Sequence, residues 1–280
     1  MSSFFDRLVI SIEGVTGVGK STFLNELNRQ LDRLSRGLPM ESFSAGRRYD
    51  NAPQATRTML HVDPDTVPLR LTTVPTPVEK QTNFFGYNLS SYARTNPTEH
   101  AFPFNVLVAM SHFEQQAEHP DAQVLISERS PQTTVAVFDR LPRNEEGLRS
   151  YKSLLSEYMV SAMGMVPHAY IYLRADPEIV QKRLGEGAED VSLLQKFHDE
   201  WLDEMNPMYP GLTMGRVLRS NVFVVNCNGS IPEMLSNIPD VTEFIKQKAR
   251  EQLTITKPPA TFRIEREREC CACMFCALTK

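Results

Sequence analysis

The amino-acid sequence predicts an α/β protein, in which a parallel β-sheet carries helices on both faces. Four short apolar runs are rich in β-branched or aromatic residues, which is typical of buried strands. These runs are 8–12, 124–126, 169–173 and 222–225. Segments with the apolar spacing of helices separate them, and strands that alternate with helices form parallel sheets covered on both faces.

The helical segments are recognised by apolar residues that recur on one helix face. After the first strand, Phe23, Leu27 and Leu31 have this spacing in a segment that begins near Lys20. The later segments are 84–116, 151–165, 177–184, 191–205 and 231–253. Residues 38–75 are rich in Pro, Ser, Thr and Arg and lack such periodicity, so they predict a long loop or insertion.

Length and composition fit one large globular domain. The 280 residues are 41% hydrophobic and 23% charged, and we assign 1–253 to one domain that contains the insertion at about 38–75. The net charge of −4 argues against a protein that binds duplex nucleic acid, because such proteins neutralise many phosphates. No apolar run is long enough for a membrane helix and the N-terminus lacks a signal-peptide pattern, so we expect a cytoplasmic protein.

Residues 254–280 are predicted to form a C-terminal appendage. Pro258 and Pro259 precede a run in which Arg and Glu alternate. Four of the five cysteines follow at the end of the chain: Cys270, Cys271, Cys273 and Cys276. One interpretation is S-acylation, which would anchor the domain to a membrane, with Met274 and Phe275 adding apolar area. Half of a zinc site and an incidental chain end are the alternatives.

Residues 14–21 match the motif G-x-x-x-x-G-K-[ST], the phosphate-binding loop (P-loop) of nucleoside triphosphate sites. The motif lies between a predicted strand and a predicted helix, as phosphate binding requires, because the loop N–H groups and the helix N-terminus both attract an anion. Lys20, expected as an exposed loop residue, would reach the β- and γ-phosphates, and the Ser21 hydroxyl would bind Mg²⁺. The predicted nucleotide-binding residues here are Gly14, Val15, Thr16, Gly17, Val18, Gly19, Lys20, Ser21 and Thr22.

A second polar segment, Ser127 to Ser130, follows the 124–126 strand. Open α/β sheets bind ligands at the carboxyl ends of their strands, which is where this segment falls. Glu128 would hold Mg²⁺, and Arg129 would hold an anion or a transferring phosphoryl group. A solvated surface ion pair is the alternative, and the position at a strand end disfavours it.

In the order and spacing of its motifs, the chain resembles the deoxyribonucleoside kinases, which include thymidine kinases. The similar segments are 76–80 (TPVEK), 86–89 (GYNL), 102–105 (FPFN), 128–130 (ERS), 172–178 (YLRADPE) and 198–202 (HDEWL). Enzymes of this family transfer the γ-phosphoryl group of ATP to the 5′-hydroxyl of a deoxynucleoside. The resemblance therefore implies a P-loop kinase fold, ATP and Mg²⁺ as cofactors, and a deoxynucleoside, with pyrimidines favoured, as substrate. The divergence of this chain from the family pattern is typical of a viral or fast-evolving member.

The resemblance also implies roles for single residues. Lys20, Glu128 and Arg129 would be catalytic, and Arg183 would contact the triphosphate. Asn105 stands where the family has a glutamine that pairs with the base. The substrate-binding residues that it implies are Thr76, Phe104, Asn105, Val108, His112, Arg129, Phe138 and Glu189. A plain core role is the alternative for the two phenylalanines and for the histidine.

Some positions depart from the family pattern. Thr76 stands where the family has the glutamate that acts as general base, and threonine cannot accept a proton near neutral pH. Gln81 replaces an aromatic wall of the base pocket, and Arg94 replaces a tyrosine near the 3′-hydroxyl. Glu79 or another carboxylate would then replace the base, or base catalysis contributes little because positioning dominates phosphoryl transfer. The third interpretation is a degenerate kinase with a structural role.

Two further alternatives stay open at this point. One is a nucleoside monophosphate kinase of the thymidylate type, although 76–80 and 102–105 favour a nucleoside acceptor. The other concerns partners: a homodimer and a membrane contact through an acylated tail are both compatible with the sequence.

Overall fold

The computed structural model describes residues 7–43, 54–63, 67–78, 88, 91, 97–140, 167–185, 190–204 and 221–256. Within these ranges the strands are β1 (Leu8–Glu13), β2 (Thr56–Leu60), β3 (Leu69–Val74), β4 (Val124–Glu128), β5 (Ala169–Arg174) and β6 (Val222–Asn226). The helices are α1 (Lys20–Ser35), α4 (Pro97–Ala117), α5 (Pro131–Ala136), the 3-10 helix η2 (Phe138–Arg140), α7 (Pro177–Leu184), α8 (Val191–Glu204), α9 (Ile231–Leu235) and α10 (Ile238–Thr256).

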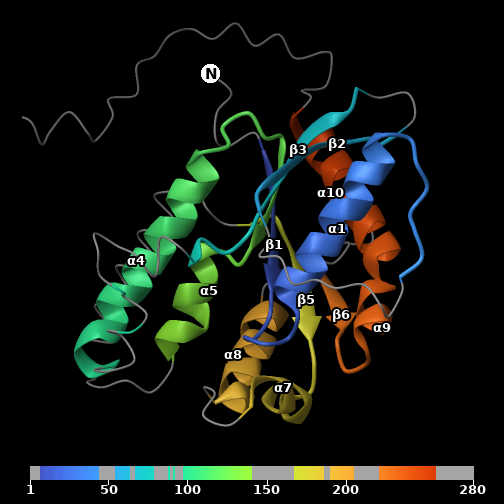
Figure 1. The fold of residues 1–280 in the computed structure, drawn as a ribbon. Helices are drawn as coiled ribbons and strands as arrows, with labels where there is room; N and C mark the ends of the chain where they lie inside the picture. Colours follow the sequence, from blue (N-terminus) through green and yellow to red (C-terminus); the bar gives the residue numbers. More distant parts are fainter. Residues whose placement is uncertain are drawn as a thin grey trace, which may run out of the picture.

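The strands form one mostly parallel sheet in the order β2-β3-β4-β1-β5-β6 (Figure 1). Strand β1 lies in the middle and pairs in parallel with β4 and β5. Helices lie on both sides of the sheet, which confirms the predicted α/β fold class. Because these three strands run in the same direction, the segments that follow Glu13, Glu128 and Arg174 leave the sheet at the same edge.

The expectation of a loop throughout 38–75 is wrong, because this stretch contains β2 and β3. Strand β3 pairs in parallel with β4, whereas β2 pairs antiparallel with β3 at the edge of the sheet. Strand β3 is buried along most of its length, including Thr72 and Thr73, whereas β2 alternates between exposed and partly buried residues. Threonine is β-branched and suits a strand, so the Pro-, Ser- and Thr-rich composition concealed two real strands.

Most of the other predicted helices and strands are confirmed, and two of the helices differ in their bounds. Strands β1, β4, β5 and β6 and helices α1, α7 and α8 occur where the sequence predicts them. The predicted helix at 231–253 consists of two helices, α9 and α10. Helix α4 occupies the C-terminal part of the predicted 84–116 segment. The predicted helix at 151–165 lies outside the described residues. In the part of the chain that the structure describes, no helix is both long and apolar enough to span a membrane.

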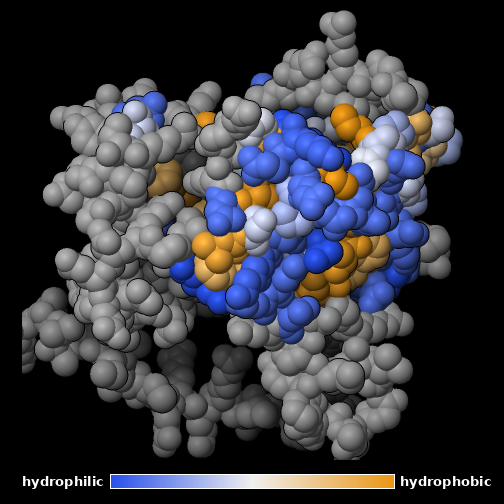
Figure 2. All heavy atoms as spheres, turned by 90° about the horizontal axis from the view of Figure 1, so that it is seen from below, coloured by the Kyte–Doolittle hydropathy of each residue, from blue (hydrophilic) through white to orange (hydrophobic). Residues whose placement is uncertain are grey.

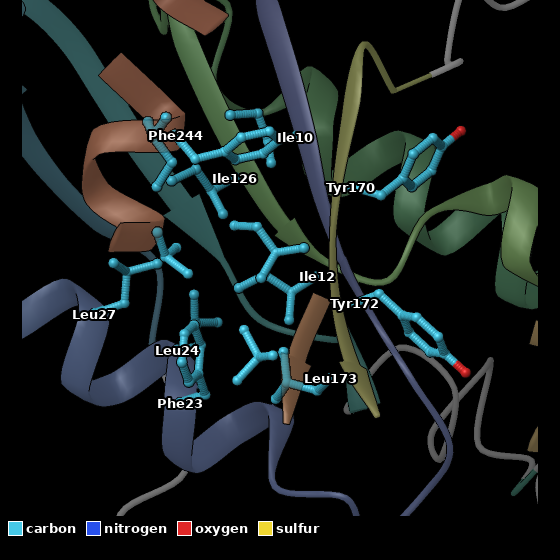
Figure 3. Close-up of a cluster of buried hydrophobic side chains, with 14 of the residues drawn as sticks. Ile10, Ile12, Phe23, Leu24, Leu27, Ile126, Tyr170, Tyr172, Leu173 and Phe244 are labelled. Carbon is cyan, nitrogen blue, oxygen red and sulfur yellow. The ribbon is translucent and has the colours of Figure 1, made fainter. Parts of the chain in front are cut away.

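One face of the sheet is apolar and packs against α1 and α10. Ile10 and Ile12 of β1 and Ile126 of β4 are fully buried there. Figure 3 shows these side chains pointing toward Leu24, Leu27 and Phe244, which come from the two helices. Burial of these aliphatic side chains is the main stabilising contribution on this face, and it fixes β1 and the start of α1 relative to each other.

The opposite face carries polar side chains among its buried residues. Alternation along β1 directs Ser11 and Glu13 to this face, and their paired neighbours on β5 are Tyr170 and Tyr172. Figure 3 shows both tyrosines pointing away from the apolar core. Their hydroxyls donate hydrogen bonds to Gln132 of α5, at 2.5 Å, and to Asp199 of α8, at 2.7 Å. Helices α5 and α8 therefore cover a layer of buried polar side chains, and the candidate site lies at one end of it.

Candidate active site

The P-loop has the backbone shape that its sequence predicts. It joins β1 to α1, and Gly14, Gly17 and Gly19 all have positive φ angles, of 138°, 80° and 110°. A Cβ atom on Gly14 would lie 2.5 Å from the carbonyl oxygen of Leu173 in β5, so only glycine fits there. Figure 2 views this end of the molecule from below, and its described surface is mainly hydrophilic. The loop is thus closely packed against the sheet and open toward solvent at Thr16 and Gly17.

Lys20 is buried rather than exposed, which corrects the expectation from the motif. Its side chain is 6% exposed, and Nζ donates hydrogen bonds to the carbonyl oxygens of Gly14 and Val15, at 3.0 and 2.9 Å. Burial, followed by the positive charge of Arg129, lowers the pKa of Lys20 to about 7. An anion bound in the loop would stabilise the ammonium form, so the loop is arranged for a ligand of negative charge.

Glu128, the last residue of β4, connects the P-loop to the β3 end. Its Oε1 accepts a hydrogen bond from the Ser21 hydroxyl at 3.0 Å. Its Oε2 accepts the backbone N–H of Thr76 at 3.4 Å, and the Thr76 hydroxyl donates to the Glu128 carbonyl oxygen at 3.4 Å. The structure therefore brings together three residues that lie far apart in the sequence, each predicted to be part of the site.

Arg129 has a left-handed backbone with φ 69°, which no other non-glycine residue in the described ranges has. Its backbone N–H donates to the carbonyl oxygen of Ile12 at 3.0 Å. Its guanidinium group donates to the Thr16 hydroxyl at 3.4 Å and lies 5.1 Å from the ring centre of Phe138. The bend after β4 thus turns the arginine side chain toward the P-loop, with a predicted substrate residue beneath it.

Glu13 is a buried charged residue at the site that the sequence analysis did not identify. It ends β1, is fully buried, and accepts hydrogen bonds from Ser11, Ser130 and Thr133. Burial raises the pKa of this carboxyl, and the three hydroxyls and Arg129 partly oppose that shift. An acidic residue directly before a P-loop, at the end of an otherwise apolar strand, is the sequence signal that would have found it.

Arg183 lies near the P-loop but on its outer side. At the end of α7, its Nη2 donates to the carbonyl oxygens of Cys227 and Gly229, at 2.9 and 3.0 Å. A pocket of about 400 Å³ lies between Arg183, the loop after β6 and the P-loop, and it is lined by Gly17, Val18, Gly19, Thr22, Arg183, Gly229, Ser230, Ile231 and Met234. The predicted triphosphate residue therefore borders a pocket that shares a wall with the P-loop.

Comparison with known proteins assigns this arrangement to a family. The family model described as "Deoxynucleoside kinase" matches residues 10–252, which is more than half of the chain. The chain belongs to the deoxynucleoside kinase family. No significant match to a curated protein sequence was found. Membership in the family makes the protein a phosphotransferase of the kinase type with a nucleotide-binding site, and it implies an ATP-type phosphoryl donor.

In this family member, α4 brings the predicted base-pocket residues to one region beside α5. Asn105 and His112 are buried on the same side of α4, and Phe104 and Val108 are half-buried. Burial, and then the charge of Arg129, lower the pKa of His112 to about 3, so its imidazole is neutral at physiological pH. Its Nε2 has no hydrogen-bond partner among the described residues.

Several predicted residues lie outside the described ranges. These are Glu189 of the substrate-binding set, the possible replacement base Glu79, the departures at Gln81 and Arg94, and the four clustered cysteines. Cys227, outside that cluster, is buried and forms no disulfide with the described residues. Within the described residues, no group of three or more His, Cys, Asp or Glu side chains could hold a metal ion.

Proposed function

We propose that this protein transfers the γ-phosphoryl group of ATP to the 5′-hydroxyl of a deoxynucleoside, with pyrimidine nucleosides favoured. The observation that carries the proposal is the meeting of three groups at one sheet edge in a deoxynucleoside kinase: the buried Lys20, the Ser21–Glu128 pair, and Arg129 turned toward Thr16. Phosphoryl transfer rests mainly on positioning and on the stabilisation of charge, and these groups supply both.

Each basic group has a distinct task in this proposal. Lys20 lies inside the loop and would exchange its two carbonyl contacts for phosphate oxygens, which offset the desolvation of its ammonium group. Arg129 contacts the loop at the Thr16 hydroxyl and would stabilise negative charge on the transferring group and on the attacking oxygen. Arg183 would contact the triphosphate, and the pocket that it borders would receive the part of ATP beyond the phosphates.

The side-chain oxygens of Ser21 and Glu128 are of the kind that binds a magnesium ion. Mg²⁺ prefers oxygen ligands and commonly takes only one or two from the protein, with the rest from water and phosphate. The Ser21 hydroxyl and the Glu128 carboxylate lie 3.0 Å apart at the mouth of the loop. A bound Mg²⁺ would neutralise phosphate charge there, and Glu128 would also be kept in place by the N–H of Thr76.

The base would be recognised by polar groups of α4. Asn105 can offer one donor and one acceptor, and a neutral His112 with an unpartnered Nε2 can offer one more hydrogen bond. A buried polar group without a partner loses free energy relative to water unless a ligand satisfies it. We favour a pyrimidine because it is smaller than a purine, and the buried imidazole of His112 would take up space beside the base.

The absence of a carboxylate at position 76 supports the second candidate, a degenerate kinase that binds nucleotide without turnover. Thr76 contacts Glu128 through both its backbone and its side chain, so this position would face the proposed reaction centre. A lost general base lowers the rate about 10²- to 10⁴-fold, which leaves a slow enzyme rather than an inactive one.

One assay separates these possibilities. The purified full chain is incubated with labelled ATP, Mg²⁺ and each nucleoside or nucleoside monophosphate, and the products are identified, with Lys20→Ala as the control. We expect 5′-monophosphates of pyrimidine deoxynucleosides, and none with Lys20→Ala. Product only from monophosphates would establish the thymidylate-type alternative. ATP binding without turnover of any acceptor would establish the degenerate kinase.

A further inference from the structure

The strained backbone of Arg129 needs a structural element that maintains it. A left-handed conformation is unfavourable for a residue with a Cβ atom, and such residues persist where the surrounding contacts determine the backbone. In this protein the strained residue also carries the guanidinium group that faces the P-loop. The contacts on both sides of Arg129 therefore decide where that group points.

Both flanking contacts lead to the last two residues of β1. On one side, the N–H of Arg129 itself donates to the Ile12 carbonyl at 3.0 Å. On the other side, the Ser130 hydroxyl donates to Glu13 Oε1 at 3.0 Å, and the Ser130 N–H donates to the Thr133 hydroxyl at 3.2 Å. Thr133 in turn lies 2.7 Å from both oxygens of Glu13. The residue after Arg129 is thus attached twice to one carboxylate.

We propose that Glu13 is a positioning residue: its buried carboxylate, acting through Ser130 and Thr133, holds Arg129 in the left-handed conformation that directs its guanidinium group to the transferred phosphoryl group. This role rests on the proposed function, because it assigns Glu13 to that reaction. Glu13 touches neither substrate in this proposal. It acts on the reaction only through the backbone of Arg129.

The chemistry of the Glu13 site fits a rigid anchor. A fully buried carboxylate is costly unless hydrogen bonds replace its water, and three hydroxyls do so here. The same hydroxyls come from β1 and from the first turn of α5, which begins directly after Ser130. One carboxylate thus connects the strand that precedes the P-loop to the segment that carries Arg129. A shift of about 1 Å in a positioning contact can change a rate about 10²-fold, so loss of this anchor is expected to be visible in kcat.

The first test replaces Glu13 by residues of similar length. Glu13→Gln keeps one carboxamide oxygen as an acceptor, whereas Glu13→Met keeps the volume and removes every acceptor. We expect Glu13→Met to lower kcat about 30- to 100-fold with KM for ATP within about threefold of wild type, and Glu13→Gln to recover most of the loss. A kcat for Glu13→Met within about threefold of wild type would overturn the proposal.

A double-mutant cycle with Arg129→Ala asks whether Glu13 acts through Arg129. When the guanidinium group is absent, its position no longer matters, so adding Glu13→Met is expected to lower kcat by less than about threefold. If Glu13→Met lowered kcat equally in both backgrounds, Glu13 would act on the reaction by another route, and the proposal would be wrong.

Two further variants keep the test informative if Glu13→Met does not fold. Thr133→Val removes one of the two links between Ser130 and Glu13, the one through the Thr133 hydroxyl, and is expected to lower kcat about tenfold or more. Ser11→Ala removes a hydroxyl bonded to the same carboxylate, at 2.5 Å, that lies outside the path to Arg129. We expect kcat of Ser11→Ala within about twofold of wild type. Equal losses in the two variants would indicate general destabilisation and contradict the positioning role.

A measurement that does not depend on catalysis tests the role of Glu13 separately from the proposed function. In the ¹⁵N-labelled full chain, the Nε–H resonance of Arg129 is assigned by comparison with Arg129→Lys and then recorded for Glu13→Gln and Thr133→Val. We expect a clear change of its chemical shift in Thr133→Val and a smaller one in Glu13→Gln. An unchanged resonance in both would overturn the positioning role even in an active kinase. A changed resonance in a protein that phosphorylates no acceptor would leave the anchor intact and remove only the proposed function.

Discussion

Lys20 shows how the fold prepares a single residue for an anionic ligand. The motif predicts that a lysine approaches the phosphates, but only the structure shows that its ammonium group is buried against two loop carbonyls before any ligand binds. Desolvation of this group depends on how β1, α1 and the strand-end segment of Arg129 pack together. A motif in the sequence cannot contain that information, because it specifies the local backbone and not its surroundings.

The pKa of Lys20 predicts proton uptake when ATP binds. With a pKa of about 7 in the free protein, below the ordinary 10.5, Lys20 is mostly neutral at pH 8, and the phosphates raise that pKa. We expect binding at pH 8 to take up about one proton and the affinity to fall, by up to about tenfold per pH unit, between pH 7.5 and 9. Calorimetry in two buffers of different ionisation enthalpy measures the uptake.

Lys20→Met is the control for this linkage. It should bind ATP more weakly and without the proton uptake. The unfolded chain holds this proton up to pH 10.5 and the folded ligand-free chain only up to about pH 7, so wild-type stability rises between these values. Lys20→Met should lack that rise in denaturant titrations. Wild-type binding that is independent of pH between 7.5 and 9 would contradict the assignment.

Position 76 offers a test of the missing general base. Thr76 lies next to Glu128, and a longer acidic side chain there would stand beside a second carboxylate. Like charges raise the pKa of such a pair, which favours proton acceptance near neutral pH. We expect Thr76→Glu to increase kcat by at least about tenfold in the nucleoside assay. Thr76→Gln has similar size and no basic oxygen, and an equal increase in it would exclude base catalysis as the cause.

At the scale of elements, the sequence predicted the central strands and missed two at the edge. Strands β1, β4 and β5 are buried on both faces along most of their length, so each contains a short apolar run that the sequence reveals. Strand β2 alternates exposed and half-buried residues, and β3 hides its β-branched threonines in a stretch dominated by loop-forming residues. Strand β3 is fixed by its pairing with β4, which is a contact between distant parts of the chain, and β2 is fixed by its pairing with β3.

The polar layer beneath α5 and α8 also depends on contacts between distant parts of the chain, so the sequence did not predict it. The alternation of side chains along a strand shows that Ser11 and Glu13 share a face. It does not show which helix covers that face. The carboxylate became interpretable only through Thr133 and Ser130, more than a hundred residues away. The P-loop was predictable because all of its groups are contiguous, whereas the part of the site that positions Arg129 is not.

The packing of the P-loop against β5 predicts a difference between two glycine substitutions. Gly14→Ala would place a Cβ atom 2.5 Å from a backbone carbonyl at φ 138°, whereas Gly37 has φ 71° and nothing within 4 Å of its Cβ position. We expect Gly14→Ala to lower the free energy of unfolding by about 2–3 kcal/mol and Gly37→Ala by about 1 kcal/mol. Denaturant unfolding measures both. Equal losses would show that β5 does not constrain the loop.

At the scale of the whole molecule, the two faces of the sheet have different tasks. The apolar face against α1 and α10 holds β1 and the P-loop helix together with Ile10, Ile12 and Ile126. The polar face carries buried groups such as Tyr170, Glu13 and His198, of which His198 keeps one ring nitrogen, Nε2, without a hydrogen-bond partner among the described residues. This face leads to the strand ends where the site lies. Both faces bury apolar side chains, which on the second face include Leu194, Trp201 and Leu202 of α8, and only the second face also carries the buried Glu13 carboxylate near the reaction centre.

The C-terminal segment is rich in cysteines, and their chemistry suggests a role for it. Cys270, Cys271, Cys273 and Cys276 follow a segment in which arginine and glutamate alternate. Neighbouring cysteines can each carry an acyl chain, and two lipid anchors suffice for stable membrane attachment of a globular domain. The arginines attract anionic headgroups, although the glutamates between them weaken that attraction. We expect that acylation of these cysteines brings part of the protein to membranes in eukaryotic cells.

The test compares the full chain with a version that ends at Glu269 and with a full chain in which the four cysteines are replaced by serine. Thioesters are cleaved by hydroxylamine, so the treatment should release the full chain from the membrane fraction and leave the two variants unchanged in the soluble fraction. Because both variants keep the predicted 1–253 domain, their nucleotide binding should equal that of the full chain. Release by a zinc chelator instead of hydroxylamine would indicate a metal-dependent contact. A full chain that stays wholly soluble would show that the cysteines are not an anchor.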